Sequence, residues 1–235
     1  MSSLIPFTHN NLTLLIRDGA TVAAERDIVK EVQIAYEWDF PIETAIDIGA
    51  HVGAWTRYAK WRHPKAAIAA IEVDPQNYEI LQLNLEGMPD VMTFNARAGY
   101  LSGPHVIGRH MVNSGSTSVH HAGEEFTANK LYELPDREWV HAPAAISLEY
   151  IMNVTGMVER VDVLKLDCEG SEVEILNHIT PQALSRIQRI VGEIHTVPDV
   201  FGEDTDDRLL VAGYQVVYAA HPGDPNLFYF HAWRN

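Results

Sequence analysis

The sequence lacks the features of several protein classes. Its single cysteine, Cys168, excludes an intrachain disulfide, and we expect a cytoplasmic protein, because thiols stay reduced there. No apolar run is long enough to cross a bilayer, and the first residues do not show the basic and then apolar pattern of a signal peptide. Basic residues are few: 17 Lys and Arg stand against 32 Asp and Glu, for a net charge of −15. Such a charge repels phosphate backbones and anionic lipids, so we expect no nucleic acid or membrane partner.

The sequence also lacks the G-x-G-x-x-G motif of dinucleotide-binding folds, and a different glycine turn stands in its place. An apolar segment carrying Asp47 runs into a turn with Gly49 and Gly53. Glycines let the backbone approach a ligand, whereas an acid here would repel a pyrophosphate and suits an amine-bearing ligand such as S-adenosylmethionine. The next apolar run ends near Glu72, whose carboxylate can accept two hydrogen bonds from a ribose diol. These residues predict a nucleoside-cofactor site; a turn that only connects strand to helix is the alternative.

Short apolar runs alternate with helical segments along most of the 235 residues, which suits one α/β domain with additions. The pattern predicts a mostly parallel, doubly wound sheet that ends in a hairpin. The expected strands are 45–48, 66–73, 91–96, 162–166, 187–194, 214–219 and 227–233, and the expected helices are 21–38, 54–61 and 75–85. We expect residues 1–44 to form an N-terminal extension with a helix packed on the core, and residues 45–235 to form the main domain.

The region from about 100 to 146 interrupts this alternation. It contains Gly103-Pro104, the polar run 113–118 and several histidines. An irregular insertion of this length in a compact domain is usually a lid or a substrate-binding loop, and a small β-extension on the sheet edge is the alternative. The histidines have no regular ligand spacing, so they do not indicate a zinc site.

The fourth predicted strand carries Lys165 and ends in Asp167-Cys168-Glu169. Strand alternation puts Lys165, Asp167 and Glu169 on one face. A lysine inside a central strand needs a carboxylate partner, and Asp167 is the nearest by spacing. Either this pair is only structural, or Asp167 and Glu169 line the reaction centre. Cys168 is expected to be a small buried hydrophobe, because no activating base is evident.

The fifth predicted strand ends in Glu193-Ile194-His195, so Glu193 and His195 share a face. With Asp167 on the neighbouring strand, they offer oxygen and imidazole ligands for a divalent metal, although we do not expect one. His195 could instead act as a general base, because an unperturbed imidazole titrates near neutrality. A histidine that is simply hydrogen-bonded or exposed at a strand end is the third interpretation.

Four segments in order resemble the FkbM family of S-adenosylmethionine-dependent methyltransferases. They are 45–53, 71–75, 147–149 and 162–172, and the last is the most specific because its K-x-D-x-E-G-x-E pattern is distinctive of the family. The run 114–118 resembles a Gly/Ser stretch of the family domain, while His51 and Glu149 stand where the family has Asn and Asp. The resemblance spans 45–195. It implies a Rossmann-like class I methyltransferase fold, with a mostly parallel, doubly wound seven-stranded sheet and an antiparallel last strand, in which 100–146 is inserted.

The resemblance also implies how S-adenosylmethionine is bound. Asp47, Gly49 and Gly53 are assigned to the methionine moiety, and His51 in the same turn is a further cofactor-binding residue whose size could alter the pocket. Glu72 is assigned to the ribose, and Asn95 and Ala96 to the adenine. We therefore expect methyl transfer to a hydroxyl of a small molecule, sugar or natural product, with Asp167, Glu169 or His195 positioning or deprotonating the acceptor. The alternatives are N-methylation of an amine, which an acidic site could attract, and a non-catalytic nucleoside-binding or regulatory module of the same fold. The oligomeric state is left open.

Overall fold

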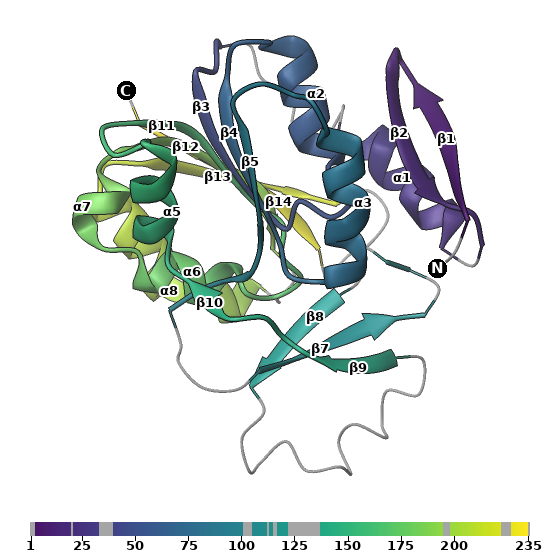
Figure 1. Ribbon diagram of the computed structural model, residues 1–235. Coiled ribbons are helices and arrows are strands. Elements are labelled where there is room, and N and C mark those ends of the chain that lie inside the picture. The colour runs from purple at the N-terminus through teal and green to yellow at the C-terminus, as the bar shows by residue number, and fades with distance from the viewer. Residues whose placement is uncertain are drawn as a thin grey trace.

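A seven-stranded sheet forms the centre of the computed structural model, with helices on both faces (Figure 1). The structure describes residues 3–19, 21–32, 40–100, 105–111, 113–114, 117–121, 137–194, 198–221 and 227–234. From edge to edge the strands are β13 (Gln215–Ala220), β14 (Phe228–Trp233), β12 (Ile187–Ile194), β11 (Val161–Leu166), β3 (Thr44–Ile48), β4 (Ala67–Glu72) and β5 (Val91–Asn95). Neighbouring strands are parallel, except that β14 is antiparallel to both β12 and β13. This confirms the predicted mostly parallel sheet of seven strands with an antiparallel last strand.

The central strands β3 and β11 are buried along almost their whole length, which explains their nearly continuous apolar sequences. The polar exceptions have partners. Asp162, at the start of β11, accepts hydrogen bonds from the backbone N–H groups of Glu43 (2.7 Å) and Thr44 (3.0 Å). Lys165 lies directly opposite Asp47 in the parallel register of the two strands. A buried charge in one strand is therefore matched by an opposite charge in its neighbour.

Helices cover the sheet on both faces, and each face has its own apolar cluster (Figure 1). The helices are α1 (Val22–Glu31), α2 (Ala54–Arg62) and α3 (Pro75–Leu85) on one face, and α5 (Leu148–Thr155), α6 (Glu172–His178), α7 (Pro181–Leu184) and α8 (Pro198–Val211) on the other. Helix α3 begins at the residue predicted for it, because the Asp74 side chain accepts a hydrogen bond from the Gln76 N–H and Pro75 occupies the first turn. Among the described residues, no helix combines the length and the apolar character that a membrane span requires.

An N-terminal hairpin lies beside α1 and was not among the predicted elements. Its strands are β1 (Leu4–His9) and β2 (Leu12–Arg17), joined by two asparagines with positive φ, as tight hairpin turns require. The side chain of Asn84 in α3 fixes β2 to the core: Oδ1 accepts from the Leu15 N–H (2.7 Å), and Nδ2 donates to the carbonyls of Leu15 (2.9 Å) and Val52 (2.8 Å). The predicted helix 21–38 corresponds to α1, which runs from Val22 to Glu31. Residues 33–39 lie outside the described residues.

The inserted region contributes a separate antiparallel sheet below the main one in Figure 1. Its strands are β7 (His105–His110), β8 (Thr117–His121) and β9 (Arg137–His141), with β7 in the middle, and a short parallel pair, β6 (Arg97–Ala98) and β10 (Ala145–Ile146), leads into and out of it. Arg109 in β7 ties this sheet to the start of α3 through two hydrogen bonds to the Asp74 carboxylate, at 2.5 and 2.6 Å.

Candidate active site

A cavity of about 430 Å³ lies beyond the carboxyl ends of the central strands. Its wall includes the turn after β3, the end of β4 at Glu72, and the loop after β11. The insertion contributes Ser114, and α1 contributes Glu31. Open α/β sheets bind their ligands beyond the carboxyl ends of the strands, and this volume is in the range of small-molecule sites. The cavity is therefore the candidate active site.

The turn after β3 is held tightly between the two neighbouring strands. The N–H groups of Gly49 and Ala50 both donate to the carbonyl of Ile71 in β4, at 3.0 and 2.9 Å. On the other side, a Cβ atom built on Gly49 would lie 1.7 Å from the carbonyl oxygen of Asp167. Gly49 also has a φ of +78°. Glycine is thus needed here for close approach to the adjacent strand, and the Gly49 backbone still lines the cavity.

Asp47 and Lys165 form a buried ion pair behind this turn. The Lys165 ammonium lies 3.2 Å from Asp47 Oδ1 and 3.4 Å from Asp167 Oδ2, and it donates to the Gly49 carbonyl at 2.9 Å. Asp47 Oδ2 accepts from the Thr56 hydroxyl at 2.7 Å. Burial alone would lower the pKa of Lys165, but the two carboxylates outweigh it and raise that pKa. Lys165 lines the cavity, whereas Asp47 is fully buried and does not, so direct contact of Asp47 with a ligand stays a prediction.

The Glu72 carboxylate ends β4 and lines the cavity. Its Oε2 accepts from the His51 N–H (2.9 Å), and its Oε1 accepts from the Asp74 N–H (2.8 Å) and from Asn77 Nδ2 (3.3 Å). Burial raises the pKa of Glu72 to about 7, although these hydrogen bonds act in the opposite direction. Each carboxylate oxygen can accept more than one hydrogen bond, so Glu72 keeps acceptor capacity toward the cavity.

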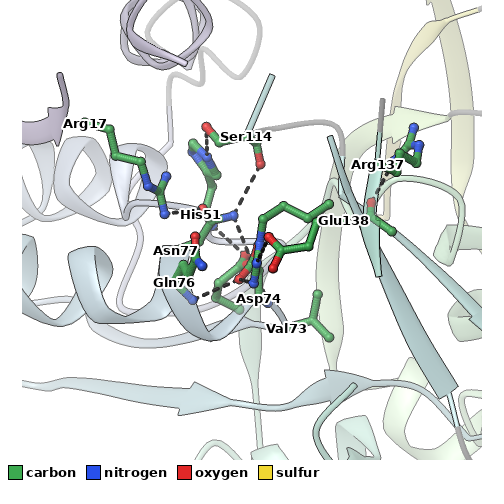
Figure 2. Close-up of polar contacts among 12 residues, drawn as sticks. Arg17, His51, Val73, Asp74, Gln76, Asn77, Ser114, Arg137 and Glu138 are labelled. Carbon is green, nitrogen blue, oxygen red and sulfur yellow. Dashed lines mark hydrogen bonds and ion pairs between the residues drawn. The ribbon is translucent and has the colours of Figure 1, made fainter. Parts of the chain in front are cut away.

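His51 joins the turn to the insertion, as Figure 2 shows, and through Ser114 to the N-terminal extension. Its Nε2 lies 2.9 Å from Ser114 Oγ, which donates to Glu25 Oε1 at 3.0 Å, and Glu25 also binds Arg17 Nη1 at 2.6 Å. Because the Ser114 hydroxyl gives its hydrogen to Glu25, Nε2 must donate to Ser114, which leaves Nδ1 as an acceptor. Burial lowers the pKa of His51 to about 4, so the ring is neutral near pH 7.

One atom of this network is left for a ligand. His51 Nδ1 is buried and has no hydrogen-bond partner within the described part of the chain, while His51 lines the cavity. A buried acceptor without a donor costs about 1–3 kcal/mol, and a bound hydroxyl or ammonium group could supply that donor.

The remaining predicted cofactor residues divide into one that lines the cavity and two that support it. Ala96 lines the cavity and donates its N–H to the Glu72 carbonyl at 3.2 Å. Asn95 does not line it: Asn95 Nδ2 donates to the carbonyls of Glu72 (2.9 Å) and Val73 (3.2 Å), and so joins the ends of β4 and β5. Gly53, with a φ of +88°, caps the start of α2 and is likewise absent from the wall.

The loop after β11 brings the predicted catalytic carboxylates Asp167 and Glu169 to the cavity. The buried Glu172 carboxylate holds this loop by accepting from the N–H groups of Cys168 (2.9 Å) and Gly170 (3.0 Å). In the K-x-D-x-E-G-x-E pattern, the second Glu, Glu172, therefore holds together the loop that carries the first, Glu169. Cys168 is half-buried and lines the cavity, contrary to the expectation of a buried side chain, but partial burial still raises the pKa of its thiol and so disfavours a nucleophile.

The structure brings together a set of possible metal ligands that differs from the set that strand spacing predicted. Glu193 lies with Glu31 and His221, and one ligand atom of each is within 4.8 Å of the other two. Asp167 does not belong to this group, and His195 lies outside the described residues. No pattern in the sequence marked Glu31 or His221, because they come from the end of a helix and from a hairpin turn.

Comparison with known proteins agrees with this architecture. A family model for the methyltransferase FkbM domain matches residues 47–216. The 31-O-demethyl-FK506 methyltransferase FkbM of Streptomyces tacrolimicus is 25% identical over 223 residues, covering 81% of this chain and 84% of that protein. The AMB antimetabolite synthetase AmbE of Pseudomonas aeruginosa is 27% identical over 188 residues, covering 68% of this chain but 9% of that protein. This chain thus spans less than a tenth of AmbE.

Among solved structures, the METTL16 methyltransferase domain is 12% identical, with a TM-score of 0.50 over 91% of this chain and 68% of that one. That likeness concerns the fold alone. The family model, by contrast, covers most of the chain, from the acid of the glycine turn to the penultimate strand. The chain belongs to the FkbM family of S-adenosylmethionine-dependent methyltransferases.

Proposed function

We propose that the chain transfers a methyl group to a hydroxyl oxygen of a small molecule, sugar or natural product. The single observation that carries the proposal is the joint lining of one cavity by Glu72, His51, Asp167 and Glu169. When bound, S-adenosylmethionine supplies an activated methyl group, which the acceptor oxygen takes as the oxygen loses its proton and the sulfur keeps the electron pair. The relative named 31-O-demethyl-FK506 methyltransferase supports an oxygen acceptor.

The hydrogen-bond acceptors in the cavity fit this cofactor. Glu72 has acceptor capacity for the ribose hydroxyls, and Nδ1 of His51, which has no partner among the described residues, can accept from a hydroxyl or ammonium group. Gly49 and Ala96 line the cavity with small, uncharged groups, which leave room for the cofactor. Asp47 does not line the cavity and is proposed to act indirectly, through its ion pair with Lys165. We propose that Gly53 and Asn95 shape the turn and the strand end that these groups depend on.

The carboxylates of Asp167 and Glu169 are proposed to position the acceptor and to take up its proton. His195 keeps the same proposed role, one residue beyond the described end of β12. The net charge of −15 supports a neutral or cationic small-molecule acceptor and disfavours nucleic acid and anionic membranes.

A second candidate is N-methylation. Among the described residues, four carboxylates line the cavity besides Glu72: Glu31, Asp167, Glu169 and Glu193. Such a wall would attract an ammonium group, which must lose a proton before it can accept a methyl group. A panel of matched alcohols and amines, assayed for S-adenosylhomocysteine release, separates the two proposals. Turnover restricted to amines would contradict O-methylation, and cofactor binding without turnover on any acceptor would indicate a non-catalytic module.

The pH dependence of cofactor binding tests the role of Glu72. Because the pKa of Glu72 is about 7, the carboxyl group becomes neutral below pH 7 and loses acceptor strength toward ribose hydroxyls. We expect the dissociation constant for S-adenosylmethionine, measured by calorimetry, to rise by about tenfold per pH unit as the pH falls below 7. Glu72→Gln should bind about tenfold or more weakly at pH 8 and show no such slope.

A matched variant distinguishes Glu72 from its neighbour. His51, with a pKa of about 4, does not titrate between pH 5.5 and 8, so His51→Asn should weaken binding without removing the slope. A flat profile in the unmodified protein would contradict the assignment of Glu72 to the ribose.

A further inference from the structure

Three side chains able to bind a metal converge on the cavity wall. Glu31 is the last residue of α1, Glu193 lies near the end of β12, and His221 directly follows β13. One ligand atom of each lies within 4.8 Å of the other two, and all three residues line the cavity. Since Glu31 and His221 are 190 positions apart, no local spacing brings them together.

The distance between Glu31 and His221 fits a shared ion. Glu31 Oε1 and His221 Nε2 are 3.1 Å apart. Two ligand atoms that are each about 2.1 Å from an ion, and about 90° apart as seen from it, are separated by about 3.0 Å. The direct contact of Glu31 with His221 can therefore open into joint coordination with little movement of either side chain.

A supporting residue is already present behind the group. The Tyr229 hydroxyl donates to Glu31 Oε1 at 2.5 Å, and the Tyr229 ring lies 5.1 Å from the His221 ring. Tyr229 is also directly opposite Glu193 in the ladder between β12 and β14. Carboxylates that bind metals are usually oriented by such outer hydrogen bonds.

The local field is strongly negative. The carboxylates of Glu31, Glu193 and Asp167 all line the same cavity. A divalent cation would neutralise part of this concentration of negative charge.

We propose that Glu31, Glu193 and His221 bind a divalent transition-metal ion on the wall of the cavity. Two carboxylates and one imidazole suit Mn²⁺, Fe²⁺ or Zn²⁺ better than Ca²⁺, which prefers oxygen ligands throughout. Three protein ligands leave coordination positions open toward the cavity. The site shares only Glu193 with the set Asp167, Glu193 and His195 expected from strand spacing.

The role of the ion rests on the proposed function, whereas its binding does not. An acceptor hydroxyl at an open coordination position becomes more acidic, and its proton can pass to Asp167 or to solvent. The ion would favour acceptors that present a hydroxyl next to a second oxygen, because two adjacent oxygens can occupy two open positions.

Metal titration of the full chain tests the site. Protein stripped with EDTA and desalted is titrated with MnCl₂, and binding is followed by calorimetry and by the loss of the free Mn²⁺ signal in electron paramagnetic resonance. We expect one saturable equivalent per chain. Glu193→Gln and His221→Ala should each weaken binding by about tenfold or more. The matched control is Glu169→Gln, which removes a carboxylate from the same cavity but outside the group and should keep the original affinity for Mn²⁺.

Circular dichroism of each variant confirms that the fold is retained. Absence of saturable binding for both Mn²⁺ and Zn²⁺, or equal affinities in Glu193→Gln, His221→Ala and the unmodified chain, would overturn the proposal. Full turnover by metal-free protein would overturn the role of the ion. Because S-adenosylmethionine binding is measured separately without metal, failure of the metal site leaves the proposed methyl transfer intact and distinguishable.

Discussion

Gly49→Ala is expected to abolish stable folding or to lower the free energy of unfolding by more than about 4 kcal/mol. The new Cβ would lie 1.7 Å from the carbonyl oxygen of Asp167 and 2.6 Å from its carbonyl carbon, both of which are backbone atoms. Relief requires β3 and β11 to move apart, although their ladder continues to the N–H of Asp167, which donates to the Ile48 carbonyl. Thermal and urea unfolding, followed by circular dichroism, measure the loss.

Gly87→Ala is the matched control for this substitution. Gly87 has a φ of +71°, close to that of Gly49, but no atom lies within 4 Å of the position that its Cβ would occupy in the turn after α3. It should show only the cost of a left-handed conformation, about 1–2 kcal/mol. Equal losses in the two variants would mean that backbone conformation, and not the contact with Asp167, accounts for the requirement at Gly49.

Lys165→Met is expected to destabilise the protein by about 3–5 kcal/mol. Methionine nearly preserves the shape of the side chain but leaves the fully buried Asp47 carboxylate without its cation. The Gly49 carbonyl also loses the hydrogen bond that it accepts from Nζ. Because this carbonyl belongs to the glycine turn after β3 that we propose binds the cofactor, weaker binding of S-adenosylmethionine should accompany the loss of stability.

Two comparisons separate charge from packing at this site. Asp47→Asn introduced into Lys165→Met removes the unpaired charge and should restore a large part of the lost stability, so the double-mutant cycle should show strong coupling. Lys30→Met makes the same change at an exposed pair with Asp27 and should cost less than about 1 kcal/mol. Additive losses for Asp47 and Lys165 would be inconsistent with a buried ion pair.

The glycine turn and the strands around it were predictable because their signals are local. The buried parallel strands appear as continuous apolar runs, and the turn carries Gly49 and Gly53 at its two ends. Glu72 and Asp167 could be placed near one another because parallel strands present their carboxyl ends at the same edge of the sheet. Family membership followed from the same segments.

The structure confirms the predicted partner of Lys165 and adds a second one that spacing along one strand could not reveal. Alternation pointed to Asp167, two residues away, and the structure does bring Asp167 Oδ2 to 3.4 Å. The closer carboxylate belongs to Asp47 on the neighbouring strand, at 3.2 Å. Which strand becomes the neighbour, and in which register, depends on how the whole sheet assembles.

Contacts between distant segments required the tertiary structure. His51 meets Ser114 across 63 positions, and Ser114 meets Glu25 across 89. These contacts arise where the N-terminal extension, the glycine turn and the insertion pack together, and none of the three segments carries a pattern that specifies the others. The group of Glu31, Glu193 and His221 arises in the same way.

The chain alone therefore indicated the α/β fold, the family and the edge of the sheet where we propose that the cofactor binds, because hydrophobic periodicity and turn chemistry are encoded within a few neighbouring residues. Only the tertiary structure decided which polar atoms face the cavity, since that depends on strand register and on packing between elements far apart in sequence. In the structure, Asp47 and Asn95 bind neighbouring groups behind the cavity wall, whereas Glu31 and His221 line the cavity.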